Sequence, residues 1–446
     1  MKYLAALLCV CWMSSGLSAA KPNIVLIMAD DFGYECVTAN GGQSYKTPNI
    51  DRLAASGMRF EQCHVMPLCT PTRVQLMTGR YNIRNYINFG TLLRSETTFA
   101  HLLKDQGYAT AVCGKWQLGS ESDSPQHFGF DESCLWQQTR RPPRYANPGL
   151  EVNGVERNFS NGEYGPNLVN DFALDFIDRH KEKPFFLYYP MILTHDPFQP
   201  TPDSVDWDPK TDSESKQKNV KYFSDMTAYM DKLVGRLDAK LDELGIRDNT
   251  LVIFIGDNGT HSTVTSRFKG VDFQGGKGRT THRGYHVPMV VHWPAVVKPG
   301  GVNTDLISGA DFLPTISAAA GATVPANVDG VSFMPQLQGQ AGVPRDSLYM
   351  WYSPRQKNDL TVREFAFNHR FKLYRNGHFY DLTTDPEETQ PLALASLAGD
   401  GAAAAKKLQN VLDQFTGARP AELDRQFEKS ISGSEKPKKR KRNKNQ

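Results

Sequence analysis

The sequence predicts an α/β fold: a large mixed, mostly parallel sheet flanked by helices, plus a smaller C-terminal antiparallel sheet with a helix. Two observations lead to this prediction. Short, nearly continuous apolar runs alternate with helical patterns, as expected for strands buried on both faces of a parallel sheet. Near Pro344 the pattern changes to short aromatic-rich segments, which are typical of antiparallel strands.

The expected strands of the large sheet follow the apolar runs. These runs lie at 23–29, 109–113, 185–192, 250–255 and 289–291. Between the runs, Thr98 is placed to cap a helix that ends at Gly107, and a longer amphipathic helix starts near Phe223 and ends at Gly245. This alternation indicates parallel strands joined by helical crossovers.

The C-terminal part is expected to form a second, α+β subdomain over 344–430. Aromatic-rich strands fall within 347–381, with a turn at Asn376-Gly377, and an alanine-rich helix follows over about 392–415. The last eleven residues hold seven basic residues and no acidic ones. We therefore expect 431–446 to be a basic, disordered tail.

The N-terminus has the three parts of an export signal. Lys2 precedes an apolar stretch at 4–12, and Ser18-Ala19-Ala20 offers a small-residue cleavage site. The stretch is shorter than the roughly 20 residues that span a membrane, so no stable membrane span is expected. These features predict a signal peptide over 1–20 and a periplasmic or secreted protein that starts at Lys21.

Charge and cysteine content narrow the function classes further. The formal net charge is +3, and because the tail is so basic, the rest of the chain is mildly acidic and gives no case for nucleic-acid binding. Five cysteines remain after signal removal, so in an oxidising compartment at least one stays unpaired. Their spacing does not suggest a zinc site.

Polar residues stand where four of the expected strands end. Asp30 and Asp31 follow the first run, Lys115 the second, His195 the third, and Asp257 with Asn258 the fourth. Ligands of open α/β sheets bind at the carboxyl ends of the strands. The sequence therefore predicts a site for a metal and an anion at this edge.

Residues 69–73, CTPTR, form the sharpest local feature. Thr70 suits an N-cap and Pro71 the first helical position, with a helix running to about Thr78 before Gly79. Cys69 would then lie at a helix N-terminus, where unpaired N–H groups attract anions. Arg73 follows about one turn later.

The pattern C-x-P-x-R resembles the signature of type I sulfatases, the formylglycine-dependent family of the alkaline-phosphatase superfamily. In that family a maturation enzyme oxidises the cysteine to formylglycine. Five further segments resemble the family in the same order, at 22–31, 47–60, 114–119, 256–259 and 275–294, and a sixth, at 371–389, resembles its C-terminal sheet. The resemblance implies a sulfatase catalytic domain over 21–343.

The same resemblance implies a set of site residues. The metal ligands would be Asp30, Asp31, Asp257, Asn258 and the modified Cys69. The implied ion is Ca²⁺, and the all-oxygen ligand set agrees with a hard cation, with Mg²⁺ left open. Arg73 would hold the formylglycine hydrate, Lys115 would bind metal-side and sulfate oxygens, and His195 and Lys277 would contact the ester and its leaving oxygen.

The implied reaction explains these residue types. Cations offset the negative charge of the sulfate ester, and one hydroxyl of the hydrate attacks sulfur. His195 or Lys277 protonates the departing alcohol. The second hydroxyl then loses its proton and sulfate is expelled.

One position departs from the family, and a few others are weaker candidates. Gln117 replaces the usual histidine, and an amide cannot take up the proton of the elimination step. Arg140, Arg141 and Arg144 form a basic loop that suits extra sulfates or a uronate, with a solvated loop as the alternative. His282 is expected at the rim of the pocket, or simply on the surface.

We therefore predict an exported sulfatase acting on a sulfated small molecule or glycan, with sulfated carbohydrate as the main expectation. Two alternatives remain open at this stage. One is a phosphoester hydrolase of the same superfamily, because sulfate and phosphate are both tetrahedral anions. The other is a sulfoglycan-binding protein that lost turnover together with the histidine replaced by Gln117.

Overall fold

The structure of the protein is a computed structural model that describes residues 20–210, 219–356 and 359–432. The predicted signal peptide before Ala20 and the basic tail after Ser432 lie outside these residues, so both stay predictions, as do the proposed domain boundaries. Over the described ranges, no helix has both the length and the apolar character that crossing a membrane requires.

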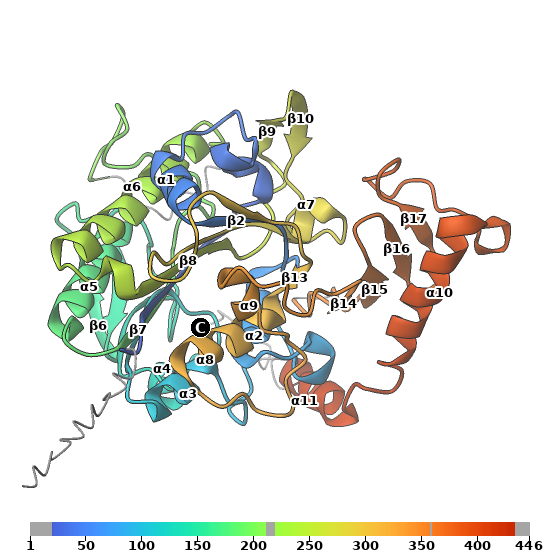
Figure 1. The fold of residues 1–446 in the computed structure, drawn as a ribbon. Helices are drawn as coiled ribbons and strands as arrows, with labels where there is room; N and C mark the ends of the chain where they lie inside the picture. Colours follow the sequence, from blue (N-terminus) through green and yellow to red (C-terminus); the bar gives the residue numbers. More distant parts are fainter. Residues whose placement is uncertain (1–19, 211–218, 357–358, 433–446) are drawn as a thin grey trace, which may run out of the picture.

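A mixed sheet of eleven strands forms the centre of the molecule (Figure 1). Its order is β12-β2-β11-β8-β1-β7-β3-β4-β5-β6, with β13 paired to β2. The bounds are β1 Asn23–Ala29, β2 Met58–His64, β3 Ala109–Lys115, β4 Glu132–Trp136, β5 Gly149–Val152, β6 Val155–Asn158, β7 Phe185–Pro190, β8 Thr250–Gly256, β11 His286–His292, β12 Gly301–Asn303 and β13 Ile307–Ser308. Strands β8, β1, β7, β3 and β4 run parallel, which confirms the predicted mostly parallel sheet.

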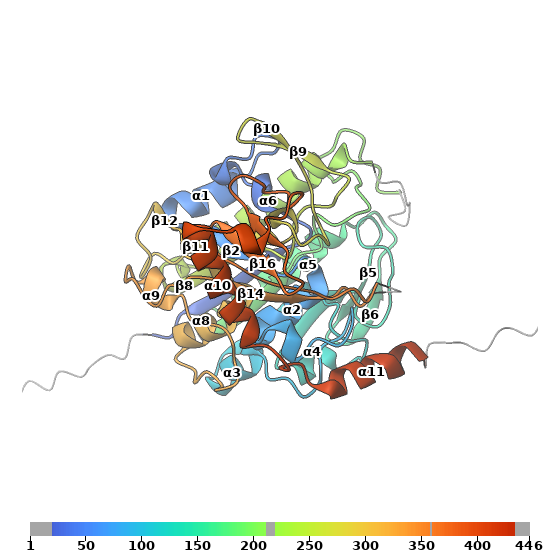
Figure 2. The ribbon, with the colours of Figure 1, turned by 90° about the vertical axis from the view of Figure 1, so that its right-hand side faces the viewer.

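Helices cover both faces of this sheet, as the alternation within β1 requires. Ile24, Leu26 and Met28 pack in one core cluster, and Val25, Ile27 and Ala29 pack in another on the opposite face. The helices on the first face are α2 Cys69–Thr78, α3 Phe99–Asp105 and α8 Phe312–Ala320, and those on the second are α1 Pro48–Ser56, α5 Gly165–His180 and α6 Tyr222–Glu243. Figure 2 shows the arrangement from a second side.

The smaller antiparallel sheet is present and lies to the right in Figure 1. It contains β14 Leu348–Tyr352, β15 Arg363–Phe367, β16 Phe371–Tyr374 and β17 Phe379–Asp381, and α10 Gly399–Asp413 packs against it. Gly377 takes a left-handed φ of +87° in the predicted turn between β16 and β17. The short remaining elements are α4 Ser124–His127, β9 Thr265–Phe268, β10 Val271–Gln274, α7 His282–Tyr285 and α9 Met334–Leu337.

Several sequence predictions are corrected in detail. The run at 289–291 is part of β11, which pairs antiparallel with both β8 and β2. The alanine-rich helix begins at Gly399, well after residue 392, and a further helix, α11 Ala421–Ser432, was not expected. Helix α11 also extends the folded chain two residues beyond the predicted start of the disordered tail at 431.

The five described cysteines are all free and buried: Cys36, Cys63, Cys69, Cys113 and Cys134. Cys113 on β3 and Cys134 on β4 are direct neighbours in the parallel sheet but do not form a disulfide. The expectation of at least one unpaired thiol is therefore confirmed.

Candidate active site

The predicted site residues meet at the carboxyl edge of the large sheet. Asp30 and Asp31 follow β1, Lys115 ends β3, and Asp257 with Asn258 follows β8; all five are buried. Three residues just beyond strand ends take left-handed backbone conformations that are uncommon outside glycine: Asp31, Gln117 and Gln137, with φ of +58°, +59° and +62°. Such strained positions cluster at functional sites.

Three carboxylates in this centre are each paired with a cation. Lys115 Nζ donates to Asp30 Oδ2 at 2.8 Å and to Oδ1 at 3.1 Å. Lys277 Nζ donates to Asp31 Oδ2 at 2.6 Å, and Arg73 Nη2 donates to Asp257 Oδ2 at 3.0 Å. The Arg73–Asp257 and Lys115–Asp30 pairs are buried, so they neutralise charge that water does not reach, whereas the Lys277 side chain is partly exposed.

The close packing of like charges changes how these groups titrate. Burial, followed by the neighbouring Asp30 charge, raises the pKa of Asp257 to about 7. Burial also acts to raise the pKa of Asp30, but Lys115, Arg73 and Lys277 outweigh it and the net pKa is lowered. Because the pKa of Asp257 is raised, additional positive charge in the centre would stabilise its ionised form.

His195 and Lys277 face each other beside Asp31. Lys277 Nζ lies 3.1 Å from His195 Nε2, and His195 Nδ1 lies 2.6 Å from the backbone oxygen of Asp196. Burial, with the Lys277 and Lys115 charges next, holds the pKa of His195 well below its usual value. Burial lowers the pKa of Lys277, but Asp31, Cys69 and Asp30 outweigh it, so the net pKa is raised. The pair is thus a charged lysine against a neutral imidazole.

The donors in this centre fit a hard cation. Among the described residues, ligand atoms of Asp30, Asp31 and His195 lie within 4.8 Å of one another. This trio shares Asp30 and Asp31 with the expected ligand set. The Asn258 amide nitrogen donates to Asp31 Oδ1 at 2.8 Å, while its buried Oδ1 has no hydrogen-bond partner among the described residues. An unpartnered buried oxygen beside three carboxylates suits an oxygen-ligated ion.

Cys69 begins α2 next to these charges. Burial, acting most strongly, raises the pKa of the Cys69 thiol, with Lys115 opposing it. Arg73, one turn along, also donates from Nη1 to the Lys115 backbone oxygen at 2.7 Å, which ties the helix to the end of β3.

The expected cap at Thr70 is wrong. The N-cap position is Leu68, and Thr70 lies inside the helix, where its Oγ1 accepts from the Gly90 N–H at 3.1 Å. The predicted end is confirmed, since Gly79 is left-handed with φ of +67° and its N–H donates to the Gln75 oxygen.

Gln117 lines a polar cavity of about 520 Å³ that opens beside the centre. We call it the Arg141 cavity; its walls come mainly from residues 87–94, 117–121 and 137–141. The Gln117 side chain is 6% exposed, and its Oε1 has no hydrogen-bond partner among the described residues. Gly90, which contacts Thr70, belongs to the same wall.

The three arginines of the basic loop have different positions. Arg140 and Arg141 line the Arg141 cavity. Arg144 instead stacks on Trp136, with its guanidinium carbon 3.9 Å from the ring centroid, and its Nη1 lies 3.0 Å from His195 Nδ1. Only Arg144 therefore contacts a predicted catalytic side chain directly.

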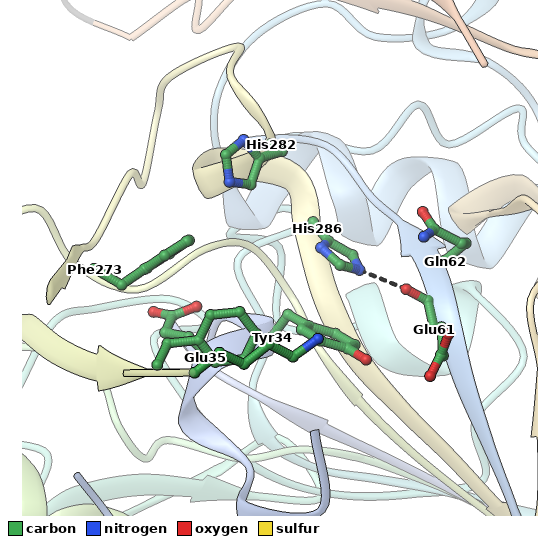
Figure 3. Close-up of a pocket in the computed structure, with 9 residues that line it drawn as sticks. Tyr34, Glu35, Glu61, Gln62, Phe273, His282 and His286 are labelled. Carbon is green, nitrogen blue, oxygen red and sulfur yellow. Dashed lines mark hydrogen bonds between the residues drawn. The ribbon is translucent and has the colours of Figure 1, made fainter. Parts of the chain in front are cut away.

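His282 lies in another cavity, of about 160 Å³, drawn in Figure 3. This cavity is lined by aromatic and acidic side chains, among them Tyr34 and Glu35, and none of the paired carboxylates borders it. His282 Nδ1 lies 3.0 Å from the backbone oxygen of Pro386. A contact of His282 with substrate stays a prediction.

A buried ion pair from the C-terminal sheet supports the loop that carries Lys277. Lys372 on β16 is fully buried and donates from Nζ to Glu388 Oε1 at 2.8 Å and to the Thr280 backbone oxygen. Tyr374 donates to Glu388 Oε2 at 2.5 Å and to Thr280 Oγ1 at 3.0 Å. Sequence analysis missed this contact because Lys372 alternates with apolar residues, a pattern typical of a solvated strand face.

We expect Lys372→Met to lower the unfolding free energy by about 3–5 kcal/mol, because Glu388 stays buried without its cation. Burial lowers the pKa of Lys372 to about 8, with Glu388 opposing it. Between about pH 8 and 10 the unfolded lysine keeps a proton that the folded one has lost, so stability gains from this residue as pH rises. In denaturant unfolding, the unfolding free energy of wild type should therefore rise relative to that of Lys372→Met across that pH window.

The double variant Lys372→Met/Glu388→Leu is the matched control. Replacing a buried ion pair with apolar side chains is often close to neutral. An equally large loss in the double variant, or a gap between wild type and Lys372→Met that shrinks as pH rises, would contradict this account.

Comparison with known proteins agrees with this centre and this fold. The sulfatase family matches residues 22–322, and the family N-sulphoglucosamine sulphohydrolase, C-terminal, matches 279–415. Human arylsulfatase A is 33% identical over 84% of this chain and 79% of its own length. N-acetylglucosamine-6-O-sulfatase of Bacteroides thetaiotaomicron is 25% identical over 82% of each chain.

Solved structures agree as well. Ps i-CgsB in complex with k-i-k-neocarrahexaose has a TM-score of 0.73 at 26% identity, over 90% of this chain and 94% of that one. The fold, its charged strand edge and these relatives therefore define a sulfuric ester hydrolase built on a mostly parallel sheet flanked by helices. The chain belongs to the sulfatase family of the alkaline-phosphatase superfamily.

Proposed function

We propose that this sulfatase is exported, that a maturation enzyme converts its Cys69 to formylglycine, and that it holds Ca²⁺ in the carboxylate centre and releases sulfate from sulfated carbohydrates. The observation that carries the proposal is the position of Cys69 at the start of α2, close to the charges of Arg73 and Lys115 and of two buried carboxylates, Asp30 and Asp257. The names of relatives that act on sulfated sugars support the substrate class.

Asp30, Asp31, Asp257 and Asn258 would hold the cation, together with the modified Cys69. The cation would supply Lewis acidity and positive charge next to the sulfate. Each of the three carboxylates is already paired with one side-chain cation in the centre. A divalent ion therefore leaves an excess of positive charge, which favours an anionic ester.

The side chains of this chain divide the remaining work. Arg73 and Lys115 would supply fixed positive charge to the site, because both side chains are buried and each is paired with a carboxylate. Lys277 Nζ and His195 Nε2 are within hydrogen-bond distance, so a proton can pass between them and on to the leaving oxygen. The aldehyde hydrate would supply the attacking hydroxyl.

One mass measurement tests the maturation step. Cleavage after Arg59 and Arg73 gives a peptide, 60–73, that contains both Cys63 and Cys69. We expect the aldehyde at Cys69 and an intact thiol at Cys63, which serves as an internal control. Export is tested separately: the N-terminal sequence of the exported protein should begin at Lys21. An unmodified Cys69 in active enzyme would overturn the formylglycine proposal.

A substrate comparison tests the reaction class. Nitrophenyl sulfate should be hydrolysed faster than nitrophenyl phosphate by metal-loaded, matured enzyme. The reverse order would favour a phosphoester hydrolase. Binding of sulfated oligosaccharide without any sulfate release would favour a non-catalytic sulfoglycan-binding protein.

For Gln117 we expect a modest role. Gln117→Ala should lower steady turnover of nitrophenyl sulfate by about tenfold or less, since one neutral hydrogen bond contributes about 0.5–1.5 kcal/mol. Stopped-flow measurement should show no burst of alcohol release in wild type, because His195 and Lys277 are close enough to move the proton. A burst followed by slow turnover, with the slow phase faster in Gln117→His, would instead show that the missing histidine limits the reaction.

A further inference from the structure

The Arg141 cavity adjoins the centre, and of the residues that line it only Gln117 has a part in the sulfate chemistry proposed above. Gln117, two residues after Lys115, forms part of its wall, and Gly90 connects that wall to Thr70, the neighbour of Cys69. Its volume of about 520 Å³ falls within the range of about 300–1,000 Å³ that is typical of ligand sites. A substrate held by its sulfate at Cys69 therefore has room to extend into this space.

The walls of the cavity carry more positive than negative charge. Its charged lining residues are three arginines, Arg94, Arg140 and Arg141, and one glutamate, Glu121. Two of these arginines are already paired: Arg94 with both oxygens of Asp123, at 3.1 and 2.8 Å, and Arg140 with Glu156 at 3.2 Å.

Arg141 differs from the other two. Its side chain is exposed, and the contact it makes is with a neutral amide: with the Gln137 carbonyl turned toward it, Nε and Nη2 donate at 2.9 and 3.0 Å. No carboxylate among the described residues pairs with Arg141. Its guanidinium is held in place by an amide that leaves the charge uncompensated, which suits recognition of an oxyanion.

The cavity also contains hydrogen-bond acceptors. Gln138 is 4% exposed, and its Nε2 donates to the backbone oxygens of Glu121 and Ser122, at 3.1 and 2.8 Å. This fixes the amide, while Gln138 Oε1, like Gln117 Oε1, has no partner among the described residues. Hydroxyl groups of a sugar are donors of the kind such oxygens need.

We propose that the Arg141 cavity binds a second oxyanion on the substrate saccharide, a further sulfate or a uronate carboxylate, with Arg141 as its principal cation. This inference rests on the proposed function and deepens it: the substrate is a saccharide with at least two anionic groups, of which one is hydrolysed and the other is recognised.

The test compares matched disaccharides with one sulfate, with two sulfates, and with one sulfate and one uronate. In Arg141→Gln, the ratio of kcat/KM for the doubly anionic to the singly anionic disaccharide should fall about 10- to 100-fold, the range for a charge-assisted hydrogen bond. Arg141→Lys should keep part of the ratio. The control is Arg236→Gln: Arg236 is a half-buried arginine on α6 that pairs with Asp171, so the variant removes the same charge outside the cavity and should leave the ratio unchanged.

The two doubly anionic disaccharides show which anion the cavity binds. A sulfate-binding cavity loses the ratio for the disulfated disaccharide in Arg141→Gln, and a carboxylate-binding cavity loses the ratio for the disaccharide with a uronate. An unchanged ratio in Arg141→Gln, or an equal fall in Arg236→Gln, would overturn the inference. Calorimetric binding of the same disaccharides to Cys69→Ala protein, with and without Arg141→Gln, gives an answer that needs no turnover. Arg141-dependent binding there supports the cavity even if sulfate release fails, and Arg141-independent binding overturns it while leaving the sulfatase activity intact.

Discussion

Cys69→Ala should reduce turnover of nitrophenyl sulfate at least about 10⁴-fold, as expected when a covalent nucleophile is removed. The fold should remain, because alanine is the best helix former and Cys69 begins α2. The thiol makes no hydrogen bond that holds other elements together among the described contacts. Nitrophenolate release and thermal unfolding measure the two effects separately.

Cys63→Ala is the matched control for this variant. Cys63 is also fully buried and lies six residues earlier, on β2, but packs in the hydrophobic core away from the charged centre. We expect Cys63→Ala to cost some stability and to leave turnover close to that of wild type. More than about 1% of wild-type activity in Cys69→Ala would rule out a nucleophile made from this residue, since a thiol-derived group could not then be essential.

Several residues of the centre, but not Arg73 or Lys277, could be predicted because they stand where an easily recognised apolar run ends. Asp30, Lys115 and Asp257 needed only the rule that strands of a parallel sheet place their carboxyl ends on one edge. The hydrogen bonds from Lys115 Nζ to Asp30 and from the Asp31 N–H to Asp257 confirm that placement. The pattern could not predict which cation pairs with which carboxylate, because the pairing depends on how far each side chain extends across the neighbouring strands.

Elements stabilised by tertiary contacts were harder to predict. Helix α11 buries Leu423 and Phe427 against Ile87, and its few apolar residues stand within a charged stretch. Strand β2 has no continuous apolar run, because Arg59, Glu61 and Gln62 stand at its partly buried positions. Threonine has a high propensity for the N-cap position, but the Thr70 side-chain oxygen accepts a hydrogen bond from the Gly90 N–H instead.

Asp257 gives the second large effect, on metal content and on turnover together. Its Oδ1 accepts from the Asp31 N–H at 2.9 Å and its Oδ2 from Arg73 at 3.0 Å, so this carboxylate joins β1, α2 and β8 at the proposed ligand set. Asp257→Ala would leave the Arg73 guanidinium buried without a carboxylate. We expect it to lower the unfolding free energy by about 3–5 kcal/mol and to abolish metal binding.

Asp257→Asn separates the ligand role from the structural one. The amide oxygen still accepts a hydrogen bond, so the fold should persist, but the loss of one negative charge should lower bound metal, and turnover should fall by at least about 100-fold. Elemental analysis after dialysis against excess chelator-free buffer gives the metal content. Asp238→Asn is the control, because Asp238 is another buried carboxylate that pairs with an arginine, Arg52, outside the centre. Full metal occupancy with normal turnover in Asp257→Asn would show that Asp257 is not a ligand, and an equal metal loss in Asp238→Asn would show that general destabilisation, rather than ligand removal, releases the ion.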